Sequence, residues 1–140
     1  MGNDNTLACS KITSPQPLCP AGTGLELTPG GIVVYINAEG MGRGDERLGQ
    51  MLMAAYMETL LHFAPRLSHL LLVNSGVKLA CKGSPSLAHL LELASMEVEI
   101  LACGTCLKFY GLSESLRAGS VSNMYTIVEV MSKSDKVLTP

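Results

Sequence analysis

The sequence of 140 residues predicts one α/β domain, with a mainly parallel sheet of four to five strands between two layers of helices. Two observations carry this prediction. Short runs of β-branched and aliphatic residues, typical of strands buried on both faces, alternate with segments whose apolar residues recur at helical spacing. The connections between the runs are too long for hairpins, which favours parallel strands joined by right-handed crossovers.

The first thirty residues differ from the rest of the chain. They lack periodicity, are rich in Ser, Thr, Pro and Gly, and contain Pro15, Pro17, Pro20 and Pro29. We therefore expect residues 1–30 to form a flexible tail or linker remnant and residues 31–140 to form the domain.

The first half of the domain contains a strand and a helix. Ile32 to Ile36 is a continuous apolar run that predicts a buried strand, and Asp45 is a plausible N-cap for the helix that follows the glycine-rich loop. We expect Pro65 to end that helix. Its apolar spacing predicts a buried face made of Leu48, Met51, Leu52, Ala55, Tyr56, Thr59, Leu60 and Phe63.

The second half continues the alternation. The sequence predicts strands at 70–73, 98–102 and 136–138, and a helix capped by Ser84 and Pro85 with Leu87, Leu90, Leu91 and Ala94 on its inner face. A short helix at 107–110 should close at Gly111. Asn123 should cap a last helix with Met124, Ile127, Val128 and Met131 on its inner face.

Composition narrows the classes of function. The chain is 47% hydrophobic, enough to form a real core, and its net charge of −2 with scattered Lys and Arg does not indicate nucleic-acid binding. No apolar run approaches the roughly 20 residues that span a bilayer, and the N-terminus has no signal-peptide pattern. We expect a cytoplasmic protein with neither membrane nor nucleic-acid partners.

Unusual residues gather where the predicted strands end. In an open parallel sheet, ligands bind beyond the carboxyl ends of the strands. The segments at these ends predict one shared cleft lined by Gly42, Arg43, Gly44, Asn74, Gly76, Lys78, Gly104, Thr105, Asn123, Met124 and Tyr125, around Cys103 and Cys106.

The Cys103-Gly-Thr-Cys106 motif carries the chemistry of this hypothesis. An odd count of five cysteines argues for reduced thiols rather than a disulfide framework. Cys103 leaves a strand for a helix N-terminus, where backbone N–H groups stabilise a thiolate, and Lys78 would add a cation. The alternative is that both cysteines are small buried hydrophobes. Their position at a strand end favours the functional interpretation.

Other chemistries fit less well. Zinc needs four ligands, whereas His62, His69 and His89 are dispersed, so we expect neither a metal nor a cofactor. A thioredoxin-type dithiol would lie after an earlier strand. The Gly40 to Gly44 loop lacks the lysine and hydroxyl of a phosphate-binding loop and is more consistent with a tight turn.

Four motifs in order resemble one known family. Met41-Gly-Arg-Gly-Asp45 with Leu48-Gly49, Gly76 to Ala80 with Gly83-Ser84, Val98 to Leu107 with Phe109 to Leu112, and Ser122 to Tyr125 are similar to the DsrE-like domain of YedF-type selenium-metabolism proteins. The resemblance covers residues 31–139.

The resemblance implies a DsrE/TusD-like fold with flavodoxin- or Rossmann-like layering, assembled as a trimer or hexamer, with a dimer as the alternative. It implies a sulfurtransferase-like protein that carries a persulfide on Cys103, with Cys106 as the thiol that resolves, receives or assists. Its partners would be sulfur-donor and sulfur-acceptor proteins, either TusA-like or linked to a cysteine desulfurase. YedF-type proteins usually begin with a TusA-like domain that carries a Cys-Pro-x-Pro motif. Leu18-Cys-Pro-Ala-Gly22 is only weakly similar to that motif.

Three hypotheses follow. The leading one is a sulfur or selenium carrier, which leaves open whether the protein is an enzyme. The second is a non-catalytic oligomeric binding module, and the third is a redox- or metal-responsive dithiol. The sequence does not distinguish sulfur from selenium, nor does it give the order in which the two cysteines act.

Overall fold

A computed structural model describes residues 31–140, so the expected tail, with Cys9 and Cys19, lies outside the described residues. Five strands form one sheet in which all pairs are parallel, in the order β4-β3-β2-β1-β5. The strands are β1 (Ile32–Ile36), β2 (Leu67–Leu72), β3 (Glu99–Cys103), β4 (Ser120–Ser122) and β5 (Lys136–Leu138). The predicted α/β class and parallel sheet are confirmed.

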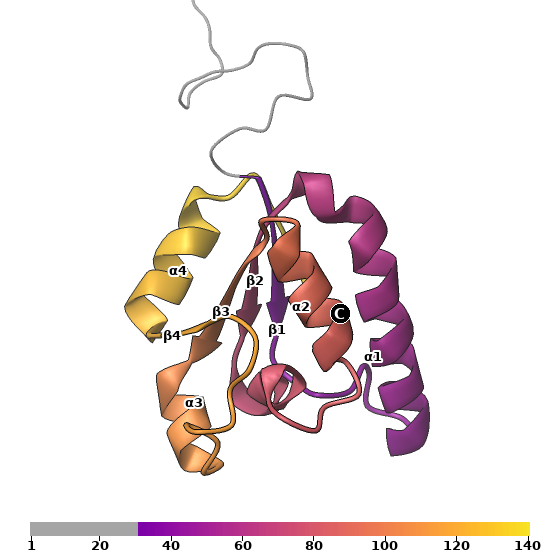
Figure 1. Cartoon of the computed structure of the whole chain (residues 1–140). Coiled ribbons are helices and arrows are strands. Elements are labelled where there is room, and N and C mark those ends of the chain that lie inside the picture. Colours follow the sequence, from indigo (N-terminus) through magenta and orange to yellow (C-terminus); the bar gives the residue numbers. More distant parts are fainter. Residues whose placement is uncertain (1–30) are drawn as a thin grey trace, which may run out of the picture.

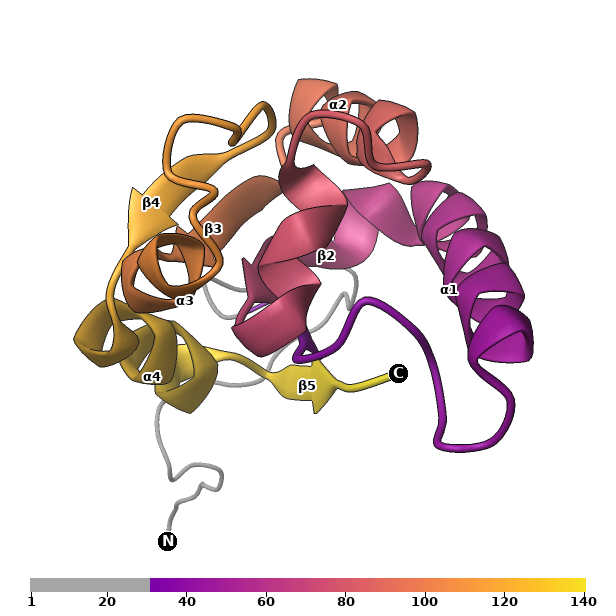
Figure 2. The same cartoon turned by 90° about the horizontal axis from the view of Figure 1, so that it is seen from below.

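Helices lie on both sides of this sheet. Figure 2 shows α1 (Glu46–Leu60) and α2 (Leu87–Ser95) on one side and α4 (Met124–Lys133) on the other. The strands in Figure 1 point toward the edge that carries α3 (Gly104–Phe109). Residues 31–140 also contain two 3-10 helices: η1 (Leu61–Arg66) precedes β2, and η2 (Asn74–Ala80) follows it. Within residues 31–140 no helix has the length and hydropathy to cross a membrane.

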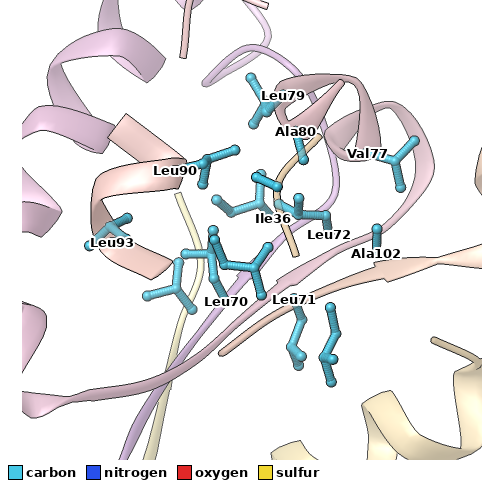
Figure 3. Close-up of a cluster of buried hydrophobic side chains, with 14 of the residues drawn as sticks. Ile36, Leu70, Leu71, Leu72, Val77, Leu79, Ala80, Leu90, Leu93 and Ala102 are labelled. Atoms are coloured by element: carbon cyan, nitrogen blue, oxygen red, sulfur yellow. The ribbon is translucent and has the colours of Figure 1, made fainter. Parts of the chain in front are cut away.

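The core sits where the central strands meet α1, α2 and η2 (Figure 3). Leu70, Leu71 and Leu72 of β2 are completely buried, as is Ile36 of β1. These strands are covered on both faces, which is why their sequences are continuous apolar runs rather than alternating ones. β4 went unpredicted because Ser120-Val-Ser122 holds one apolar residue; its pairing with β3 defines it.

The predicted buried face of α1 was mostly wrong: of its eight residues only Leu60 is buried, and Tyr56 is partly buried. The residues that face the core are Gly49, Met53, Met57 and Leu60, whereas Leu48, Met51, Leu52 and Phe63 are exposed by 42–63%. Apolar residues surround most of this helix, so periodicity alone did not choose between two stripes. Gly49 selects the inner one, because a Cβ there would lie 2.9 Å from the Met41 carbonyl oxygen.

Helix ends also differ from prediction in three places, one of which is α3, which begins at Gly104 rather than at residue 107. α1 ends at Leu60, and Pro65 lies inside the 3-10 turn η1 rather than terminating the helix itself. α2 begins three residues after Ser84, whose hydroxyl accepts the N–H of Ser86 at 3.0 Å in the preceding turn. Asp45 caps α1 as predicted, accepting the N–H of Leu48 at 2.9 Å.

The last helix is partly as predicted. Asn123 caps α4 by accepting the Thr126 N–H at 2.9 Å. Ile127 is completely buried, but Met124 and Val128 are about half exposed. The helix is therefore seated on β3 through a narrower stripe than the apolar pattern predicts.

Candidate functional site

The end of β3 positions the two cysteines of the motif. Cys103 is the last residue of the strand and is only 3% exposed, while Cys106 lies one helical turn later in α3 and is partly exposed. The chain turns at Gly104, where a Cβ would lie 3.0 Å from a Val121 methyl group. Glycine therefore allows α3 to start close against β4.

The two thiols interact with each other. The Cys106 sulfur accepts the backbone N–H of Asn74 at 3.0 Å. Burial raises the pKa of the Cys106 thiol; a hydrogen bond with the Cys103 sulfur raises this pKa further, the Asn74 N–H lowers it, and charge on Cys103 adds a smaller increase. The net result is a raised pKa for the Cys106 thiol, with Cys103 as one of its causes.

The expected contact between Cys103 and the helix amides is not made. Cys103 occupies the N-cap position of α3, but its side chain accepts no capping hydrogen bond, and α3 is only six residues long. The thiol partner of Cys103 is the other cysteine. The amide that approaches a sulfur comes from η2, not from α3.

A hydrogen bond to its side chain holds Asn74 in place. Its backbone has φ of +50°, a left-handed conformation that asparagine tolerates better than most residues. The Tyr110 hydroxyl donates to the Asn74 side-chain oxygen at 2.9 Å. Cys106 and Tyr110 are four residues apart in the α3 segment, so both meet the same residue of η2.

A lysine and a glutamate extend this network. The Lys78 ammonium lies 4.5 Å from the centre of the Tyr110 ring and 3.4 Å from a Glu39 carboxylate oxygen. The backbone N–H of Glu39 donates to the Ser75 hydroxyl at 3.1 Å. The segments that follow β1, β2 and β3 are thereby joined around Cys106.

Several predicted cleft residues come together here. Asn74 and Lys78 belong to the network, and Gly76 allows η2 to pack onto the end of β1, because a Cβ there would lie 2.5 Å from the Ile36 carbonyl oxygen. Ser122 pairs with Cys103, which brings the neighbouring Asn123 to the same edge.

Other residues of the predicted cleft are exposed or line a different hollow. Arg43, Thr105, Met124 and Tyr125 are exposed. Gly42 and Gly44 line a separate hollow of about 290 Å³, to which neither cysteine contributes. The loop that holds them is attached to α1 by the Met41 N–H, which donates to Gly49.

Sequence reasoning missed Glu39, Ser75 and Tyr110. Tyr110 ends the short helix predicted at 107–110, and its spacing of four residues from Cys106 was a usable signal. Glu39 and Ser75 gave no sequence signal, since their contact joins residues 36 positions apart.

Within residues 31–140 no group of three or more His, Cys, Asp or Glu side chains could hold a metal ion. His69 instead pairs with Glu99 at 3.3 Å, at the start of β3. The arrangement at the cysteines suits thiol chemistry: one sulfur can act as nucleophile while the other donates a proton.

Comparison with known proteins identifies the relatives. No curated protein matches the sequence. Among solved structures, the chain is similar to YchN from E. coli (TM-score 0.60, 19% identity, covering 79% of this chain and 98% of that one). It is also similar to MTH1491 from Methanobacterium thermoautotrophicum, a protein of unknown function (TM-score 0.59, 18% identity, 78% and 97% covered).

These identities show a shared fold. The model of the DsrE/DsrF-like family matches residues 31–140, the whole of the described domain. The predicted resemblance to DsrE-like proteins is confirmed, and this chain belongs to the DsrE/DsrF-like family.

Proposed function

We propose that this protein carries sulfane sulfur as a persulfide on Cys103, with Cys106 as the assisting thiol. In the loading step the Cys103 thiolate attacks the terminal sulfur of a donor persulfide. A bond forms between the Cys103 sulfur and that sulfur, the donor S–S bond breaks, and the donor thiolate leaves with the electron pair. No external oxidant or reductant is needed, because the sulfane sulfur only changes partner.

The placement of the two thiols is the observation that carries this proposal: Cys103 ends β3, and Cys106 follows one turn later in α3, close enough for each thiol to influence the other. When Cys103 has lost its proton, the Cys106 thiol stabilises the charge by donating to it. The same donor is available to the persulfide anion that results. The near-complete burial of Cys103 supports a carrier role, since shielding from solvent protects a reactive intermediate.

Membership of a family with members in sulfur-relay systems supports protein partners as donor and acceptor. TusA-like proteins and cysteine-desulfurase systems are the partners we propose. Selenium can take the place of sulfur in the same step, and the mass of the adduct distinguishes the two cargoes.

We also propose that the chain acts as a homo-oligomer. Leu48, Met51, Leu52 and Phe63 leave an apolar stripe exposed on α1 and η1, the kind of surface that subunit interfaces cover. Light scattering should give a mass above that of the monomer, and Met51→Lys should lower it. A monomer at micromolar concentration would contradict this proposal.

Intact-mass spectrometry after exposure to a sulfane-sulfur donor tests the carrier proposal. We expect the purified chain to gain the mass of one sulfur atom in a form that a reducing agent removes. Cys103→Ser should abolish the gain, and Cys81→Ser, which replaces another buried thiol of the domain, should keep it. An adduct that survives Cys103→Ser, or a Cys103–Cys106 disulfide as the only product, would overturn the proposal.

A further inference from the structure

A second hollow lies beside the thiol network and has no part in the proposed sulfur transfer. Its volume is about 500 Å³, within the range of small-molecule sites. It is bordered by α1, by the end of η2, by the turn that leads into α2, and by the residues that end and follow α3. Neither Cys103 nor Cys106 lines it.

Positive charge prevails at its border. Lys78 and Lys82 line the hollow, against one carboxylate, Glu39. Lys78 is engaged with Glu39 at 3.4 Å, in a pair exposed enough to exchange partners with a ligand. Lys82 is exposed and has no ion-pair partner among residues 31–140.

The start of α2 supplies a second, independent feature. Ser86 lines the hollow, is only 3% exposed, and is the N-cap of this nine-residue helix. Its hydroxyl makes no capping bond, and no other described residue hydrogen-bonds it. The hydroxyl of this largely buried serine has no protein partner, so at a helix N-terminus it is a suitable donor to an anion, which the helix dipole also favours.

The remaining walls are apolar. Met53 of α1 and Leu79 of η2 are buried side chains that line the hollow, together with Leu112 and the ring of Tyr110. Such walls accept a hydrocarbon or aromatic body, while the lysines and Ser86 accept an acidic head group.

We propose that this hollow binds a small organic anion, with a carboxylate or phosphate head held by Lys82 and Ser86 and an apolar body against Met53, Leu79 and Leu112. The site is independent of whether Cys103 carries sulfur. Lys78 belongs both to this hollow and to the network around Cys106, so the two sites are adjacent.

Titration of the folded chain with benzoate, phenyl phosphate and the neutral benzamide, followed by backbone-amide NMR, tests the proposal. We expect saturable shifts centred on residues 82–87 with at least one of the anions, and binding of benzamide at least about tenfold weaker. Preference between benzoate and phenyl phosphate identifies the head group.

Variants separate this site from general charge attraction. Lys82→Gln should weaken binding about tenfold or more. Ser86→Ala should weaken binding less, and its NMR spectrum should remain that of a folded protein, since Ser86 makes no capping bond. Lys108→Gln is the matched control, because Lys108 is an exposed lysine of α3 that does not line the hollow. No saturable binding at millimolar concentration, equal affinity for benzamide, or an equal loss with Lys108→Gln would overturn the proposal.

Discussion

Cys103 and Cys81 have nearly the same exposure but different surroundings. Each is 3% exposed, and each lies near the carboxyl edge of the sheet. Cys81 donates to the Val77 carbonyl at 3.3 Å, and its pKa is raised by burial, with a lowering contribution from the charge of Arg117. Cys103 has a second thiol as its partner.

Equal burial therefore does not give the two cysteines equivalent surroundings. A thiol that donates to a carbonyl oxygen is satisfied as a neutral group and loses that bond when it ionises. A thiol that faces another S–H donor gains a hydrogen bond to its anion. The two buried thiols therefore differ in the group that each one faces, a carbonyl oxygen at Cys81 and a second thiol at Cys103, and the predictions below test that contrast.

The largest effect should come from removing the proton donor of the pair. Cys106→Ala leaves Cys103 without its S–H partner, so we expect sulfur loading of Cys103 to slow by about a hundredfold, the scale of a lost proton donor. The rate is measured by intact mass against time. Cys81→Ala should change this rate less than twofold, and an equal slowing in both variants would remove the distinction between the two environments.

Gly76→Ala tests the backbone that presents Asn74 to Cys106. A Cβ there would meet the Ile36 carbonyl at 2.5 Å, so η2 must shift, at a cost of about 2 kcal/mol in the free energy of unfolding. Denaturant unfolding gives that cost. The alkylation rate of Cys106 should change as well, because the Asn74 N–H moves away from its sulfur. Gly44→Ala is the control, because Gly44 has open space around it and no positive φ.

The sequence was sufficient for the sheet and for Cys103 because both follow from local patterns. Continuous apolar runs predict buried parallel strands, and a cysteine that ends such a run must lie at the carboxyl edge. The network was harder to predict, because its hydrogen bonds join residues more than 30 positions apart in the sequence: Asn74 with Tyr110, and Glu39 with Lys78 and with Ser75.

The prediction of the buried face of α1 failed for a different reason. Leu48 and Met51 are as apolar as Met53 and Met57, so hydropathy alone gave two equivalent stripes. Which stripe faces the core depends on the close approach of Gly49 to Met41, a tertiary contact without a local signature. Residues of the second stripe then remain at the surface.

Tyr110→Phe should sharpen the contrast with a smaller effect. It removes the hydroxyl that holds Asn74 but keeps the ring beneath Lys78. The lost hydrogen bond is worth about 1 kcal/mol, so we expect a change of up to about tenfold in the alkylation rate of Cys106 and little change at Cys81. Mass spectrometry of peptides after timed alkylation measures both sites in one sample. Tyr125→Phe, at an exposed tyrosine of α4, is the matched control.

The smallest effect is a difference in how stability depends on pH. The pKa of the Cys106 thiol is raised in the folded chain, so its contribution to stability is complete below the unfolded thiol pKa of about 8.5 and is lost as pH rises through the folded value. Cys81 has the same sign. Cys106→Ser and Cys81→Ser should each therefore flatten the fall in the free energy of unfolding above about pH 8.5. In a Cys103→Ala background, the contribution of Cys106 to this pH dependence should shrink, because the hydrogen bond and charge of Cys103 are gone. The contribution of Cys81 to the pH dependence should stay the same. An equal contribution of Cys106 with and without Cys103 would show that the two thiols do not interact.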